Sequence, residues 1–116
     1  MDYHIESFKN LFSYCELIES IYFKKFYRNN INNMRGIFYK CSSLKELNLN
    51  NFNTINVNFM NGMFEGCSSL IKLEINFNIN NQVIMNSMLK GCSDELKELI
   101  KTEYEYIKYE AFYWKY

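Results

Sequence analysis

The stretch that decides the fold is residues 60–78, which read MNGMFEGCSSLIKLEINFN. A second copy of the pattern comes earlier in the chain, where residues 34–52 read MRGIFYKCSSLKELNLNNF. Both copies contain an apolar cluster, a Cys-Ser-Ser-Leu segment and then alternating apolar and polar residues. Self-similarity at a fixed period of about 20 to 50 residues is the signature of repeat architectures.

Four cysteines extend this pattern along the chain at a nearly constant spacing. They are Cys15, Cys41, Cys67 and Cys92. Apolar residues recur seven, four and three positions before each cysteine, and again three, six and eight positions after the first three. The third repeat is shorter than the others by a single position, because LEINFNIN (73–80) replaces LNLNNFNT (47–54).

Each repeat has two halves with different periods. Met60, Met63 and Phe64 are spaced i, i+3 and i+4, which predicts one or two helical turns packed on the core. Residues 44–49 read L-x-x-L-x-L, which predicts a short half-buried strand. The Cys-Ser-Ser segment between the halves is typical of a turn.

One such unit cannot bury its own apolar stripe, so the repeats are expected to stack with parallel strands about 4.8 Å apart. The sequence therefore predicts an α/β fold, a short right-handed leucine-rich-repeat solenoid of about four coils. Parallel strands line one face, short helical turns line the other, and a helical cap closes the C-terminal end. We expect a single domain over 1–116, divided into a degenerate first repeat (5–30), two repeats (34–59 and 60–84), a partial last repeat (85–93) and the cap (94–116).

The expected cap begins where the repeat pattern ends. Apolar residues from Leu96 to Trp114 follow helical spacing on one face, and Ser93 or Asp94 is positioned to cap the N-terminus of that helix. Such a segment would cover the last coil of a solenoid. The alternative is that its aromatic residues form a surface for a partner or for self-association; these are Tyr109, Phe112, Tyr113, Trp114 and Tyr116.

The motif M-x-x-M-F-x-G-C-S-S-L, followed by L-x-L and F-[ND]-T-x-x-V, resembles the repeat of the BspA-like leucine-rich-repeat surface proteins. The resemblance covers about residues 34–78, and it departs from the pattern at Ile37 and Lys40. It implies a cell-surface or secreted adhesion role without a catalytic centre. By contrast, the start of the chain has no signal-peptide pattern, which predicts a cytoplasmic protein if the chain is complete.

Composition argues against several function classes. Lys plus Arg and Asp plus Glu each total 13, so the net charge is zero and no nucleic-acid partner is expected. No apolar run is long enough for membrane insertion. His4 is the single histidine, no C-x-x-C pair or known catalytic motif occurs, and we expect no enzyme activity, no cofactor and no metal site.

The cysteine column has two interpretations. The first is a ladder of buried, reduced thiols that pack as small apolar residues. The second follows from stacking, because cysteines of neighbouring coils would lie about 5 Å apart, within disulfide range.

A binding face is predicted on the outward side of the strands, because Leu47 and Leu49 point inward. The candidate residues are Tyr22, Lys24, Asn48, Asn50, Glu74 and Asn76. Four strands would offer a few hundred Å², less than the figure of about 800 Å² per partner for a standard interface. The sequence thus predicts an adhesin-type module that binds a protein ligand, or alternatively a small intracellular protein-interaction scaffold; a solvated face without a ligand also fits.

Overall fold

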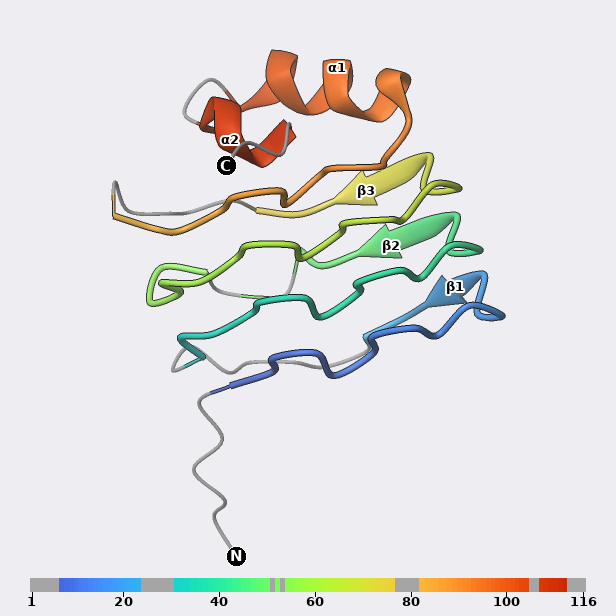
Figure 1. The fold of residues 1–116 in the computed structure, drawn as a ribbon, viewed down its shortest axis with the longest axis horizontal. Coiled ribbons are helices and arrows are strands. Elements are labelled where there is room, and N and C mark those ends of the chain that lie inside the picture. The colour runs from blue at the N-terminus through green and yellow to red at the C-terminus, as the bar shows by residue number, and fades with distance from the viewer. Residues whose placement is uncertain are drawn as a thin grey trace, which may run out of the picture.

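The computed structural model describes residues 7–23, 31–50, 52, 54–76, 82–104 and 107–112. The chain is a mixed α/β fold with three short strands, β1 (Ser20–Ile21), β2 (Glu46–Asn48) and β3 (Lys72–Glu74), and two helices, α1 (Asp94–Glu103) and α2 (Tyr109–Phe112). The strands form one parallel sheet in the order β1-β2-β3, and both helices lie beyond β3 (Figure 1).

The strand register reproduces the repeat period. Leu47 pairs with Ile21 on one side and with Leu73 on the other, each one full period away. A second ladder of parallel bridges joins Ser7, Asn33, Phe59 and Ile84, and its last step is shorter by one position. The single deletion therefore lies between Glu74 and Ile84, as the sequence predicts.

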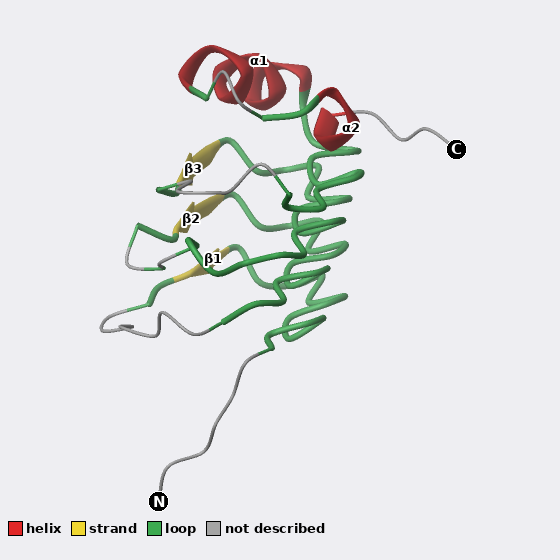
Figure 2. Cartoon of the chain, turned by 90° about the vertical axis from the view of Figure 1, so that its left-hand side faces the viewer, coloured by secondary structure: helices red, strands yellow, loops and turns green. Residues whose placement is uncertain are grey.

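The predicted helical turns are wrong. The segment opposite the strands is a run of tight turns in each repeat (Figure 2). In the third repeat, the backbone amides of this segment donate hydrogen bonds alternately within the repeat and to the next repeat. Met63 N donates to Met60 O at 3.2 Å within the repeat, whereas Phe64 N donates to Met88 O of the next repeat at 2.9 Å.

Left-handed residues explain why no helix forms there. Each repeat has two described residues with positive φ, and together these are Asn10, Tyr14, Gly36, Lys40, Gly62, Gly66, Ser87 and Gly91. A residue in this conformation cannot continue a right-handed helix and instead belongs to a tight turn. Met60, Met63 and Phe64 are nevertheless all 0% exposed. The successive tight turns direct these three side chains into the core, so the spacing i, i+3, i+4 still marks buried positions.

The core lies between the sheet and the turns. Phe12, Phe38 and Phe64 stack face to face along it, with ring centroids 5.7 and 5.8 Å apart and interplanar angles of 5° and 4°. Leu47 (2% exposed) and Leu73 (7% exposed) close it from the strand side. The inward assignment of Leu47 is confirmed, and so is that of Leu49, which is 0% exposed.

The C-terminal segment forms two helices rather than the single helix that the spacing predicts. Ser93 is the N-cap of α1, with its Oγ accepting from Leu96 N at 3.2 Å, as expected. The chain leaves the helix at Tyr104, and α2 then lies against the last repeat, where Ser87 N donates to Glu110 O and Leu89 N to Ala111 O. Carbonyls at a helix end lack partners inside the helix, so α2 satisfies amides that would otherwise be unpaired.

Candidate functional site

The parallel register gathers outward side chains from three repeats. Asn48 and Glu74 are paired positions of β2 and β3, and Tyr22 directly follows β1. Together with Glu46, Lys72 and the edge of Leu47 they line a shallow hollow of about 120 Å³. We call this surface, formed by Tyr22, Glu46, Leu47, Asn48, Lys72 and Glu74, the strand-face patch.

The chemistry of the strand-face patch is mixed. Tyr22 is 73% exposed and offers an aromatic ring with a hydroxyl, which is a combination favoured at interfaces. Lys72 Nζ lies 4.0 Å from Glu74 Oε1, and both side chains are largely exposed. Such a pair contributes little to stability, so both groups can exchange one partner for another at low cost.

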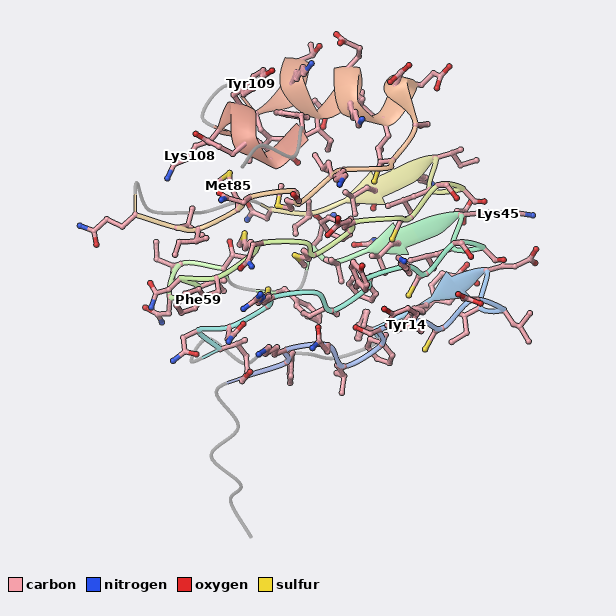
Figure 3. All side chains as sticks on the ribbon, viewed as in Figure 1. Tyr14, Lys45, Phe59, Met85, Lys108 and Tyr109 are labelled. Carbon is pink, nitrogen blue, oxygen red and sulfur yellow. The ribbon has the colours of Figure 1, made fainter. Side chains whose placement is uncertain are left out.

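A charged pair borders the patch. Lys45, which extends away from the ribbon in Figure 3, bonds Glu19 of the previous repeat at 3.0 Å between Nζ and Oε1. Both side chains are more than half exposed. The surroundings of the patch are therefore polar and hydrated, like the rim of a protein interface.

Two of the other predicted residues, Asn50 and Asn76, lie outside the hollow. Asn50 is exposed, and its backbone N donates to Asn48 Oδ1 at 2.9 Å. Asn76 is exposed as well, and its carbonyl accepts from Thr54 Oγ1 at 3.3 Å. Lys24 lies outside the described residues. The structure thus brings together Tyr22, Asn48 and Glu74 out of the six.

Sequence reasoning missed Glu46 and Lys72. Both alternate with the inward leucines Leu47 and Leu73, so the period of two that marks Asn48 as outward marks them equally. It also missed a second hollow of about 340 Å³ beside the patch, which Leu99 and Glu103 of α1 line together with Asn50, Lys72 and Glu74. That hollow exists because α1 occupies the place expected for a fourth strand.

The aromatic surface predicted near the C-terminus is only partly present. Phe112 is 3% exposed and belongs to the core, so it is unavailable to a partner. Tyr109 is 61% exposed. Tyr113, Trp114 and Tyr116 lie outside the described residues.

The cysteines are free thiols in the structure. Cys41, Cys67 and Cys92 are buried, as predicted, whereas Cys15 is half-buried. Each buried thiol donates to a carbonyl of the previous repeat, for example Cys67 Sγ to Phe38 O at 3.1 Å. Burial raises the pKa of Cys41 to about 11 and that of Cys92 to about 12, and it also raises the pKa of Cys67. These thiols are therefore poor nucleophiles.

The described residues show neither a metal-binding cluster nor a membrane-spanning helix. They contain no group of three or more His, Cys, Asp or Glu side chains arranged to hold a metal ion. Nor does any helix among them combine the length and apolar character that crossing a bilayer requires.

Comparison with known protein families gives a match over most of the chain. A family model described as "Mycoplasma protein of unknown function, DUF285" matches residues 3–104. No curated protein and no solved structure matches the chain.

Proposed function

Since the chain belongs to the DUF285 family, whose function is unknown, we propose from its own residues that it is a non-catalytic protein-binding module. Its architecture is a right-handed leucine-rich-repeat solenoid of about four coils. Residues one period apart pair in parallel at both ladders, which supports a coil of one repeat. The resemblance of residues 34–78 to the BspA-like repeat supports the same architecture and an adhesion or surface-recognition role.

The observation that carries the proposal is the alignment of unlike outward side chains around one hollow. Tyr22, Asn48 and Glu74 come from three repeats and line this hollow together with Leu47. A stack of repeats presents one such side chain per coil to a ligand lying across the strands. An aromatic ring, an amide and a carboxylate in one row supply both contact area and specific hydrogen bonds.

The size of the patch limits its affinity. Three strands span about 10 Å at the usual spacing, so the patch is smaller than the area of about 800 Å² that each partner contributes to a standard interface. The neighbouring hollow against α1 enlarges the contact area with Ile71, which is 69% exposed, and Leu99, which is 44% exposed. We expect weak binding by a single chain and stronger binding when several chains act together.

The chemistry of the patch favours recognition over catalysis. It holds no histidine or cysteine, and the exposed Lys72–Glu74 pair lacks the burial that prepares groups for acid–base work. The buried thiols, with raised pKa values, are unsuited to nucleophilic attack.

A second candidate is a small intracellular scaffold of the same fold. Three buried cysteines that form no disulfide favour it, because thiols persist in reducing compartments. The two candidates share the strand-face patch and differ in the partners it meets.

A retention assay distinguishes the adhesion module from the intracellular scaffold. The chain is immobilised and tested against purified extracellular matrix proteins and intact cells. We expect measurable retention of a matrix or surface protein, with an increase when the chain is presented on a multivalent support. The variant Tyr22→Ala/Asn48→Ala/Glu74→Ala should abolish retention, while the control Glu95→Ala, an exposed change on α1, should leave it intact.

Retention that survives the triple substitution would remove the strand-face patch from the proposal. Absence of any extracellular partner, combined with patch-dependent capture of a cytoplasmic protein, would replace the adhesion role by the scaffold. Circular dichroism of both variants checks that each remains folded.

A further inference from the structure

The turn segments lie on the side of the molecule opposite the strands (Figure 2), and their residues line a groove. Its volume is about 590 Å³, larger than either hollow on the strand side. In every repeat it is lined by the residues six and five positions before the cysteine, for example Asn61 and Gly62. A ligand in this groove would therefore contact all four repeats without touching the strand-face patch.

Two of the residues that line the groove are glycines with left-handed backbone. Gly36 and Gly62 have φ values of +62° and +63° at equivalent positions of neighbouring repeats. A Cβ at Gly36 would overlap Oδ1 of Asn10, and one at Gly62 would lie 3.1 Å from Oε2 of Glu65. The side chains of Asn10 and Glu65 therefore pack beside these two glycines, in space that a Cβ at either position would take.

Two residues that line the groove each have a buried polar side-chain atom without a hydrogen-bond partner among the described residues. These atoms are Oγ of Ser87, a residue that is 6% exposed, and Oδ1 of Asn61. A buried polar atom without a partner costs stability, and such atoms in a folded protein call for an explanation. A ligand that brings hydroxyl groups supplies one, because a hydroxyl both donates and accepts.

The N-terminal half of the groove is cationic and aromatic. Lys9 and Arg35 are exposed side chains of its wall. Tyr14 and Tyr39 also line it, with their rings edge to face at 5.4 Å, and Tyr14 is 59% exposed. Lys40 Nζ lies 5.8 Å and 5.5 Å from these two ring centroids, which adds positive charge beside them.

We propose that the turn-face groove binds an acidic oligosaccharide. Carboxylates of the sugar pair with Lys9 and Arg35, and the C–H face of a pyranose ring packs on exposed Tyr14. Sugar hydroxyls extend toward the half that contains Asn61 and Ser87. An acidic peptide is less suited, because its carboxylates only accept hydrogen bonds, whereas sugar hydroxyls also donate to acceptors such as Asn61 Oδ1 and Glu65.

Calorimetric titration of the full chain with a hyaluronan hexasaccharide tests this proposal. We expect saturable binding, weakened about tenfold by Arg35→Gln, which removes a charge-assisted contact. Ser87→Ala should weaken it about twofold to tenfold, the range of one hydrogen bond, without lowering Tm, since the hydroxyl bonds none of the described residues. The control Lys72→Gln removes an equal charge from the strand side and should change nothing.

Two further ligands show whether affinity depends on the charge of the ligand, on its sugar hydroxyls or on both. Neutral maltohexaose should bind much more weakly than the hyaluronan hexasaccharide, and hexaglutamate should also bind weakly. Equal or tighter binding of hexaglutamate would overturn the proposal in favour of an acidic-peptide site. No saturation by hyaluronan at millimolar concentration, or a Ser87→Ala variant that loses Tm but keeps its affinity, would overturn it as well.

Discussion

The first repeat and the central repeats carry the same pattern but differ in burial. Four positions before the cysteine, Leu11 is 55% exposed, whereas Ile37 is 1% and Met63 0% exposed. Three positions after it, Ile18 is 36% exposed, whereas Leu44 and Leu70 are fully buried. The pattern therefore assigns a side chain to the inner side of its repeat, and the neighbouring repeats on both sides decide how completely it is buried.

The difference in burial should have its largest effect on the stability lost when an apolar side chain is shortened to alanine. Met63→Ala should lower the free energy of unfolding by about 2 to 5 kcal/mol, because it removes a fully buried side chain between two repeats. Leu11→Ala, at the equivalent position, should cost less than about 1 kcal/mol. Urea unfolding of both variants measures the two values, and equal losses would contradict the comparison.

A smaller effect is expected at the second left-handed position of a central repeat. Gly66 has a φ of +82°, and a Cβ there would lie 3.0 Å from Lys40 Cγ and 3.2 Å from Lys40 Cα. Gly66→Ala should cost about 1 to 2 kcal/mol from the backbone conformation, and more if Lys40 cannot move. Thermal melts should show a lower Tm for this variant than for the exposed control Ser68→Ala. Equal Tm values would contradict the left-handed conformation of Gly66 and its close approach to Lys40.

The buried thiols predict a pH dependence. The folded-state pKa of Cys41 is raised to about 11 and that of Cys92 to about 12, above the value of about 8.5 for an unfolded chain. Their contribution is complete below about pH 8.5 and is lost as the pH rises toward the folded values, because the unfolded state then releases protons first. Between pH 8 and 9.5 we expect a loss of roughly 1 kcal/mol per buried thiol.

Urea unfolding at these two pH values, under reducing conditions, checks the alkaline loss. The unfolding free energy of the Cys92→Ala variant should decline less with pH than that of the unmodified chain, because one thiol with a raised pKa has been removed. An identical decline in both would place the alkaline sensitivity in other groups.

The sequence predicts the features that depend on period alone. The spacing of the cysteines fixes which residues pair across repeats, and the alternation around Leu47 and Leu73 correctly identifies inward and outward positions. The sequence also locates the start of α1, because Ser93 precedes a helical pattern.

Features that depend on backbone conformation are not predicted. Tyr14, Lys40 and Ser87 adopt left-handed φ values without glycine to mark them, so the turn segments resemble helical stripes in the sequence. The end of α1 at Tyr104 has no proline or glycine signal either. The turn-face groove follows from those same left-handed turns, which is why no residue of that groove is a candidate in the sequence.

Each repeat is joined to the next through its turn amides on one side and through the parallel strands on the other, and the strand register places one outward side chain per repeat in a row. Scalar coupling across hydrogen bonds, measured by NMR on ¹⁵N,¹³C-labelled chain, identifies each acceptor directly. We expect coupling from the Phe64 amide nitrogen to the Met88 carbonyl carbon of the next repeat, and likewise from Phe38 to Met63. Coupling from Phe64 to the Met60 carbonyl, the partner in an α-helix, would contradict this expectation.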